Sequence, residues 1–293
     1  MKIVDIIGGL GNQMLQYAFA LSLKHYHPDE EVLIDTSHFN GYGLHNGYEI
    51  DRIFGQQLKK AGKLDIIKVS RYMPYYKLSR ALRKFLPLRK TEKLEDWRKN
   101  YGKYLGELQS YEGNAYYEGY WHNPKYYNGC EDEIRRGFTF PEIIDDKNRK
   151  YSQLISHSES ICIHVRRGDY VGAVSFTGIC DEGYYKKALN YALEQINNPV
   201  LFVFSNDISY CESLLLKYKD NIDIHYVDCN HGKDSFRDMQ LMSMAKCNII
   251  ANSTFSWWGA WLNTRQEHFV ISPSKWVNFT EETGMIPGKW IKI

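Results

Sequence analysis

An apolar run that stops abruptly at charged residues constrains this chain most. The run Ile161–Val165 is followed at once by Arg166, Arg167, Gly168 and Asp169. This pattern predicts a buried strand with a polar cluster at its carboxyl end. In open α/β sheets, ligands bind beyond the carboxyl ends of the strands, and an arginine there offers forked donors to phosphate. The cluster suits an anion site for a diphosphate, although a polar surface turn with an Arg–Asp pair would explain it equally well.

Two later apolar runs also end in polar residues. Residues 199–204 and 248–251 both read as buried strands. In a parallel sheet, the carboxyl ends of these two strands would lie at the same edge as the first strand end, which carries His164 and Arg166. Three polar strand ends at one edge favour a nucleotide-phosphate site over a generic polar edge. The residues that follow the two later runs are Ser205, Asn206 and Asp207, and Asn252, Ser253, Thr254 and Phe255.

A glycine-rich turn follows the first apolar run near the N-terminus. Gly9 and Gly11 would let the backbone approach a ligand at the start of a helix, where unpaired N–H groups favour an anion. In the dinucleotide-binding fingerprint G-x-G-x-x-G, Met14 occupies the position of the third glycine, so the match of this segment to the fingerprint is weak. Asn12 and Gln13 either cap the helix that follows or reach into a sugar site.

Strand-like and helix-like segments alternate along the chain, which predicts an α/β fold. The length of 293 residues and the 43% hydrophobic content suit two α/β halves of a globular protein. Around residues 141–158 the sequence becomes polar and charged, so we place a boundary there and predict domains at 1–150 and 151–293.

Positive charge is concentrated in one segment. Residues 59–103 hold fifteen Lys or Arg against four Asp or Glu, which leaves a net charge of −9 on the rest of the chain. Such a segment could face anionic lipid, nucleic acid or other phosphate-rich partners, but we favour a solvated helical face. No nucleic-acid motif is present, so we expect no nucleic-acid partner. Peripheral contact with an anionic membrane stays an open hypothesis.

Several classes of protein are disfavoured by missing motifs. The sequence has no Walker A motif, no G-x-S-x-G elbow and no Asp-x-Asp pair. A diphosphate would therefore be held by arginine and backbone groups rather than by a metal. The six cysteines form no C-x-x-C pair and are expected to be free thiols, and the absence of a signal peptide or membrane span predicts a cytoplasmic protein.

Four segments occur in an order that identifies a family. The chain closely resembles the alpha-1,2-fucosyltransferases of glycosyltransferase family 11, from the first strand to about residue 265. The resemblance implies a GT-B-like architecture of two Rossmann-like domains with a cleft between them. Residues 1–150 would form the acceptor-side domain and residues 151–293 the GDP-fucose-binding domain. It also implies that L-fucose moves with inversion from GDP-β-L-fucose to O2 of a galactose-terminated oligosaccharide, without a metal or cofactor. The segments are Gly8–Met14, His164–Tyr170, Phe204–Asp207 and Asn252–Trp261.

The wider superfamily of fucosyltransferases suggests roles for individual residues. Arg166 resembles the arginine that binds the β-phosphate of the donor, and His164 resembles a residue near the guanine. Asp207 resembles the carboxylate that reads the N1 and amino edge of guanine. Asn12 resembles a residue beside the fucose, and Asp238 is a weaker match. The hydroxyl and backbone groups around the diphosphate would come from Ser253, Thr254 and Phe255.

The resemblance does not identify the group that accepts the proton of the acceptor hydroxyl. An inverting transfer in principle uses a base, and Asp169, Asp181 and Glu182 are candidates. Asp181 and Glu182 also suit a helix N-terminus, where acidic residues are favoured. A weak or water-mediated base is the alternative to a dedicated side chain. Arg167 is expected to pair with Asp169 and hold the loop.

Two other functions compete with this reading. One keeps the donor but changes the linkage or the acceptor, whose recognition we expect in the loops 38–52 and 72–127. The other is a carbohydrate-binding module, which the 23 Tyr and 7 Trp would suit. A module of that kind has no need of Arg166 and Asp207 in a nucleotide pocket, so we prefer the enzyme.

Overall fold

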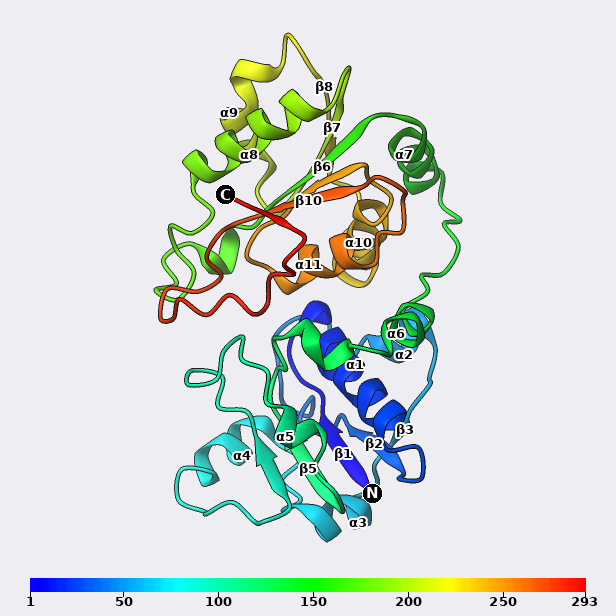
Figure 1. Ribbon diagram of the computed structural model, residues 1–293, viewed down its shortest axis with the longest axis vertical. Helices are drawn as coiled ribbons and strands as arrows, with labels where there is room; N and C mark the ends of the chain where they lie inside the picture. The colour runs from blue at the N-terminus through cyan, green and yellow to red at the C-terminus, as the bar shows by residue number, and fades with distance from the viewer. The chain divides into compact units, whose positions relative to one another are not determined.

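The chain divides into two compact units in the computed structural model, which describes residues 1–293 (Figure 1). Unit 1 comprises Met1–Pro141 and unit 2 comprises Glu142–Ile293. The predicted boundary at residue 150 is too late, because it would cut helix α7 (Asp146–His157). That helix packs against other elements of unit 2, so the whole of it belongs there.

Unit 1 contains a parallel sheet of five strands. They are β1 (Lys2–Asp5), β2 (Val32–Asp35), β3 (Lys59–Lys60), β4 (Glu92–Leu94) and β5 (Ala115–Glu118). Their order is β3-β2-β1-β5-β4. Ile3 is in register with Leu33 and Tyr116, so these side chains share one face of the sheet. That face packs against Ile66 and Val69 of helix α3 (Lys63–Val69).

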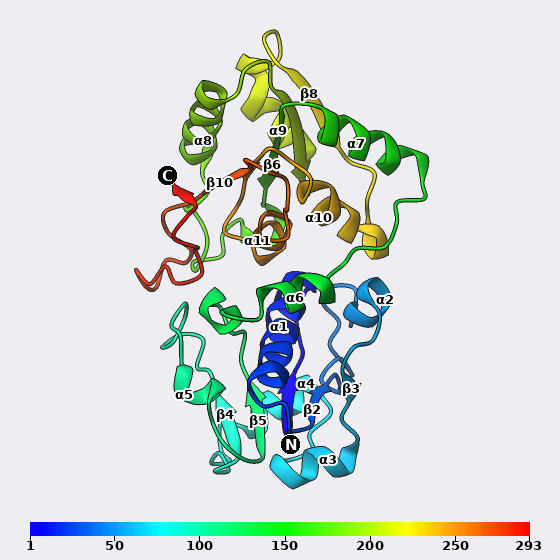
Figure 2. The same cartoon turned by 45° about the vertical axis from the view of Figure 1, so that its right-hand side comes forward.

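The longest helix of unit 1 lies on the other face of its sheet (Figure 2). Phe19 of helix α1 packs edge-on against Tyr117 of β5, with ring centroids 5.4 Å apart. Helix α1 begins at Leu10, so Gln13 and its neighbours form a first helical turn and not the predicted loop. The α-helices of this unit are α1 (Leu10–Tyr26), α2 (Ile50–Phe54), α3, α4 (Tyr76–Leu82), α5 (Gly106–Gln109) and α6 (Glu131–Gly137).

Unit 2 contains a second parallel sheet, with six strands. They are β6 (Ser160–Val165), β7 (Val200–Ser205), β8 (Asp223–Val227), β9 (Cys247–Ile249), β10 (Phe269–Ser272) and β11 (Ile291–Lys292). Their order is β11-β10-β9-β6-β7-β8. Strand β6 is buried along its whole length between β9 and β7. The strand predicted from its apolar run is therefore confirmed.

Helices flank the sheet of unit 2. They are α7, α8 (Glu182–Gln195), α9 (Ile208–Leu215), α10 (Phe236–Met242) and α11 (Thr254–Trp261). Helix α8 buries Ala188 and Leu189 in one core cluster with Ile163 of β6. Helix α10 ends at Met242, because the chain turns at Ser243 to enter β9.

The six cysteines are free thiols, as predicted. Cys130, Cys162, Cys211 and Cys247 are buried. Burial raises the pKa of the Cys211 thiol to about 11, so it stays protonated at neutral pH. These side chains act as small apolar groups in the core.

Candidate active site

The polar clusters of three neighbouring strands meet at one edge of the unit 2 sheet. Strand β6 lies between β9 and β7, all three are parallel, and Val165 is in register with Ser205. The Ser205 hydroxyl donates to the Val165 carbonyl over 2.8 Å. The Tyr170 hydroxyl donates to the Asn252 carbonyl over 3.2 Å. The shared edge predicted from the sequence is confirmed, and we call it the β6 rim: His164, Arg166, Arg167, Asp169, Asn206, Asp207 and residues 252–255.

Arg166 is the rim cation with the most unused hydrogen-bonding capacity. One terminal nitrogen of its guanidinium lies 2.7 Å from Oδ1 of Asp169. Its Nε is buried and has no hydrogen-bond partner. The guanidinium also lies over the Tyr170 ring, 5.4 Å from its centroid. Because a guanidinium has five N–H donors in a fixed fork, most of them can still bind an anion.

Arg167 pairs with a different carboxylate from the one expected. Its Nε donates to Oδ2 of Asp207 over 3.1 Å, and its guanidinium lies 3.8 Å from the centroid of the Tyr210 ring. The predicted pair between Arg167 and Asp169 is wrong. The physical reason is the turn after β6, a short 3₁₀ helix that puts Asp169 against Arg166, three residues before it.

The turn after β6 is fixed by a close contact with the next strand end. The side-chain oxygen of Asn206 accepts from the Arg167 N–H over 3.0 Å. Gly168 has a φ of +47°, and a Cβ there would lie 2.3 Å from the Asn206 amide nitrogen. Glycine is therefore the residue that this approach requires. Asn206 thus shapes the rim through its contact with the Arg167 backbone.

His164 presents a neutral imidazole at the end of β6. Burial, and then the charge of Arg166, lower the pKa of His164 to about 3. Its Nδ1 is buried and has no hydrogen-bond partner, and its ring lies 5.9 Å from that of Phe255. An unpaired buried nitrogen is unfavourable, so a ligand that hydrogen-bonds to it would be stabilised there.

The N-terminus of helix α11 faces the same rim. Ser253 is its N-cap, and the Ser253 hydroxyl oxygen accepts from the Phe255 N–H over 3.4 Å. The side chain of Asn252 donates to the Trp276 carbonyl over 3.0 Å, which anchors the turn before the helix. Thr254 is the first residue of the helix. The N–H groups of the first turn and the helix dipole make such an end attractive to a phosphate.

Asp207 already has a partner on each oxygen. Oδ1 accepts from the Tyr210 N–H over 3.1 Å as the N-cap of α9, and Oδ2 accepts from Arg167. An ionised carboxylate has about four lone-pair positions, so it can accept further hydrogen bonds. The predicted guanine-reading role is therefore compatible with this geometry.

The other candidate bases have structural partners. Asp181 is the N-cap of α8 and accepts from the Tyr184 N–H over 2.8 Å. Glu182 pairs with Lys186 one turn later. Asp169 pairs with Arg166 but is 56% exposed, which leaves it open to a ligand. Of the three, Asp169 alone belongs to the β6 rim.

Asp238 lies in a buried network of amide side chains. Its Oδ1 accepts from the Asn230 side chain over 2.8 Å, and Asn230 also donates to Asn148 of helix α7. Burial raises the pKa of Asp238 to about 7. These contacts give Asp238 a structural role in joining α10 to α7.

Gly9, Gly11 and Asn12 lie in unit 1, at the carboxyl end of β1. Gly9 is the N-cap of α1, with no side-chain cap. The Gln13 amide does not cap the helix, since it donates to the carbonyls of Gly8 and Gly47 over 2.9 and 2.8 Å. The capping role considered for Gln13 is wrong, because its side chain holds a distant loop instead.

Two aromatic residues beside the β6 rim were not predicted as site residues from the sequence. Tyr170 and Tyr210 each place a ring under one of the rim arginines. Such contacts orient a guanidinium. Tyr210 lies three residues after the N-cap Asp207, where the first helical turn faces the cap, and that spacing was the available signal.

Comparison with known proteins decides the family. The sequence model of glycosyl transferase family 11 matches residues 2–293. The chain belongs to glycosyl transferase family 11. This family 11 glycosyltransferase is 33% identical to an alpha-1,2-colitosyltransferase of Escherichia coli, over 99% of its own length and 98% of the relative. It is 29% identical to the O-antigen biosynthesis glycosyltransferase WbnK of Escherichia coli, over 98% of both chains.

A shorter match is to galactoside alpha-(1,2)-fucosyltransferase 2 of Pongo pygmaeus, at 25% identity over 47% of this glycosyltransferase and 42% of the relative. Among solved structures, POFUT1 in complex with GDP-fucose is 14% identical, with a TM-score of 0.48 over 92% of this chain and 97% of that one. The predicted α/β class is confirmed, and two units with parallel sheets are the halves of a GT-B-like glycosyltransferase. Every helix of the glycosyltransferase is too short or too polar to cross a membrane.

Proposed function

We propose that this family 11 glycosyltransferase moves L-fucose from GDP-β-L-fucose to O2 of a terminal β-galactoside, with inversion and without a metal. The observation that supports this proposal is the β6 rim, where a partly unpaired arginine lies on the same edge as a helix N-terminus. The alpha-1,2 transferases among its relatives support the linkage, and the O-antigen enzyme supports a use in surface glycan synthesis. The reaction would take place in the cytoplasm.

Two groups of rim residues suit the two parts of GDP. Arg166 and the first turn of α11 offer positive donors to the diphosphate. His164 offers an uncharged ring nitrogen, and Asp207 offers carboxylate oxygens to the N–H groups of guanine. The guanine edge carries N–H donors, so it needs hydrogen-bond acceptors in the protein. The Asp207 carboxylate is an acceptor, and the neutral ring of His164 does not repel these donors.

The chemistry requires charge stabilisation more than covalent help. The bond between sugar C1 and the β-phosphate oxygen breaks, and the acceptor O2 forms a new bond to C1 from the opposite face. The electron pair of the broken bond leaves with GDP, so negative charge grows beside Arg166 in the transition state. The acceptor proton passes to Asp169 or to water. Asn12, with Gly9 and Gly11, is proposed to contact the sugar.

Colitose is a second candidate for the transferred sugar, because the relative with 33% identity is a colitosyltransferase. Colitose differs from fucose by the absence of the 3-hydroxyl group. A site that hydrogen-bonds that hydroxyl would reject colitose strongly, whereas a site without such a contact would accept both sugars. Membership of a glycosyltransferase family sets aside the carbohydrate-binding module.

The proposed function is tested by GDP release with EDTA present, using GDP-fucose or GDP-colitose as donor and lactose or N-acetyllactosamine as acceptor. We expect turnover with GDP-fucose and an α1→2 linkage on galactose in the NMR spectrum of the product. Turnover with GDP-colitose but not with GDP-fucose would show that the proposed donor is wrong. A linkage other than α1→2 would show that the proposed regiochemistry is wrong. Loss of turnover on adding EDTA would contradict metal independence.

We also propose peripheral contact with an anionic membrane through residues 59–103. Phe85 is 84% exposed and Leu88 is 48% exposed, among basic side chains that include the exposed Lys84 and Lys90. From the sequence, a solvated helical face is the favoured interpretation of this segment. Solvation of charged groups does not explain why large apolar side chains are exposed beside them. Arg83 differs from these lysines, because it pairs with Glu92 inside unit 1.

The chain is expected to co-sediment with vesicles that contain phosphatidylserine and not with phosphatidylcholine vesicles. Each Lys or Arg near such a surface contributes about 1 kcal/mol, so Lys84→Glu combined with Phe85→Ser should abolish most binding. Lys292→Glu, on strand β11 of unit 2, serves as the control charge change. Failure of the unmodified chain to bind anionic vesicles at low salt would refute the contact.

A further inference from the structure

Unit 1 contains a pocket lined mostly by residues from the loops 38–52 and 72–127, where acceptor recognition is expected. It has a volume of about 370 Å³ and lies at the carboxyl ends of β1, β4 and β5, where it is lined by residues such as Asp5 and Glu118. The carboxyl ends of strands are where open α/β sheets bind their ligands. The volume is at the small end of the range for ligand pockets, which suits a mono- or disaccharide.

His38 supplies a fixed hydrogen-bond donor to this pocket. Its Nδ1 lies 2.9 Å from Oδ1 of Asp5, and the side chain is buried. Burial alone would lower its pKa, but the charge and hydrogen bond of Asp5 raise the pKa of His38 to about 9. The imidazole is therefore protonated at neutral pH, with one N–H used by Asp5. Its Nε2–H has no partner within unit 1, so His38 is a donor and not a base.

Glu95 supplies a fixed acceptor group to the same pocket. It is 2% exposed, and its Oε2 accepts from the backbone N–H groups of Tyr120 and Trp121, each over 2.7 Å. Its Oε1 is buried and has no partner. A Cβ at Gly119 would lie 2.6 Å from the Glu95 Cβ, so the chain closes tightly around this carboxyl group. An unpaired buried oxygen in a pocket wall is a position that a ligand hydroxyl can satisfy.

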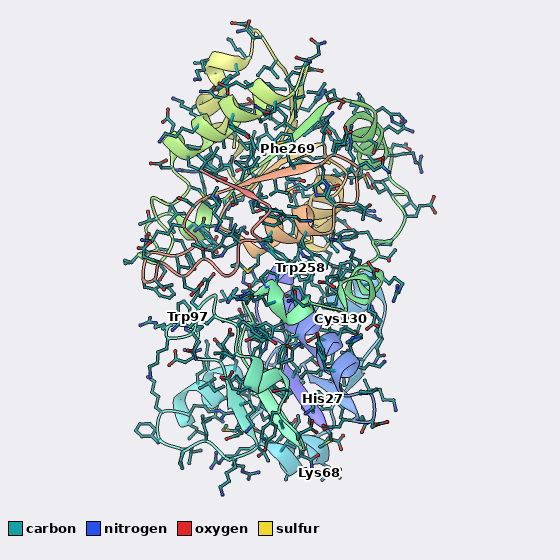
Figure 3. The ribbon with its side chains drawn as sticks, in the orientation of Figure 1. His27, Lys68, Trp97, Cys130, Trp258 and Phe269 are labelled. Carbon is teal, nitrogen blue, oxygen red and sulfur yellow. The ribbon has the colours of Figure 1, made fainter.

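Aromatic rings complete the pocket. Tyr76, Trp97 and Tyr120 line it together with His38 and Glu95. Trp97 is labelled in Figure 3. Aromatic faces offer apolar contact area to the C–H surface of a sugar ring, while fixed donors and acceptors bind its hydroxyl groups. Carboxylate residues outnumber cationic residues in the lining, which disfavours an anionic ligand.

We propose that this pocket binds an uncharged sugar unit of the acceptor, with Trp97 as its stacking surface and His38 and Glu95 as its hydroxyl-binding groups. The proposal rests on the proposed function, since it assigns the acceptor of that reaction. It places acceptor recognition at residues distant in sequence from the β6 rim. These residues are therefore specificity-determining and take no part in breaking the donor bond.

Two variants test the pocket in the full-length enzyme. Trp97→Ala removes the ring, and His38→Asn keeps a donor toward Asp5 while removing the N–H that faces the pocket. Each is expected to raise the KM for lactose about tenfold or more, as the loss of a hydrogen bond to a charged group or of an aromatic contact does. GDP affinity is expected to stay unchanged, and Trp97→Phe is expected to recover most of the loss.

The outcomes separate the pocket from the proposed function. An unchanged lactose KM in both Trp97→Ala and His38→Asn would overturn the pocket while leaving fucosyl transfer intact. If the unmodified enzyme uses neither lactose nor N-acetyllactosamine, the proposed function fails, and saturation-transfer NMR with lactose then tests the pocket alone. A lactose signal that Trp97→Ala removes would support the pocket. No signal in the unmodified enzyme, or an equal signal in the variant, would overturn it.

Discussion

Replacing Arg166 with alanine is expected to lower kcat by about 100-fold or more, with little change in the acceptor KM. Negative charge grows on the departing GDP in the transition state, and removal of one donor aimed at such charge typically costs about 10²- to 10³-fold in rate. The Arg166 side chain is 28% exposed and pairs with a single carboxylate, that of Asp169, so the remaining donors of its guanidinium suit the diphosphate. Initial rates of GDP release at saturating GDP-fucose measure the effect.

The control for this change is Arg149→Ala, which removes a guanidinium of unit 2 whose two partners, the Asp146 carboxylate and the Ile144 carbonyl, lie at the surface. Surface pairs contribute about 0–1 kcal/mol to stability, so neither arginine is needed for folding. Asp169→Asn adds a second comparison. A small loss of kcat would mean that Asp169 orients Arg166, whereas a loss as large as that of Arg166→Ala would support Asp169 as the base. Wild-type turnover in Arg166→Ala would refute the phosphate-binding role.

Replacing Trp258 with alanine is expected to lower the free energy of unfolding of unit 2 by about 3–5 kcal/mol, the usual cost of emptying a fully buried tryptophan site. Trp258 on α11, labelled in Figure 3, is 0% exposed. It packs edge-on against Trp257 and Trp261, at 5.0 and 5.3 Å between ring centroids. The loss also loosens the N-terminus of α11 at the β6 rim. Urea unfolding followed by circular dichroism measures the change.

Trp97→Ala is the matched control, because it removes the same side chain from a partly exposed position of unit 1. It is expected to shift the unfolding midpoint little and to act on the acceptor KM instead. A change below about 1 kcal/mol in Trp258→Ala, comparable to an ordinary surface substitution, would show that α11 does not depend on this aromatic core.

The β6 rim could be predicted from sequence because its signals are local. Buried parallel strands read as continuous apolar runs, and polar residues directly after residues 161–165, 199–204 and 248–251 mark their ends. The ion pairs of the rim could not be predicted in the same way. Which carboxylate each arginine meets depends on the backbone at Gly168 and on Asn206 from another strand.

The sites in unit 1 were harder to predict because their contacts are distant in sequence. Asp5 and His38 are 33 residues apart, and no motif joins them. The glycine-rich segment around Gln13 resembles a flexible turn in sequence, although it begins helix α1. The contact that fixes Gln13 is with Gly47, 34 residues away, and a local pattern does not reveal it. Charge composition alone also could not show that Phe85 is exposed within the basic segment.

The central claim is that the β6 rim binds the GDP part of the donor, and calorimetric titration of GDP in buffer with EDTA tests it most directly. The account predicts that the unmodified enzyme and Arg149→Ala bind GDP equally, and that Arg166→Ala binds it about tenfold more weakly, the loss expected for a charged hydrogen bond. Absence of GDP binding, or equal affinity in all of these proteins, would contradict the account.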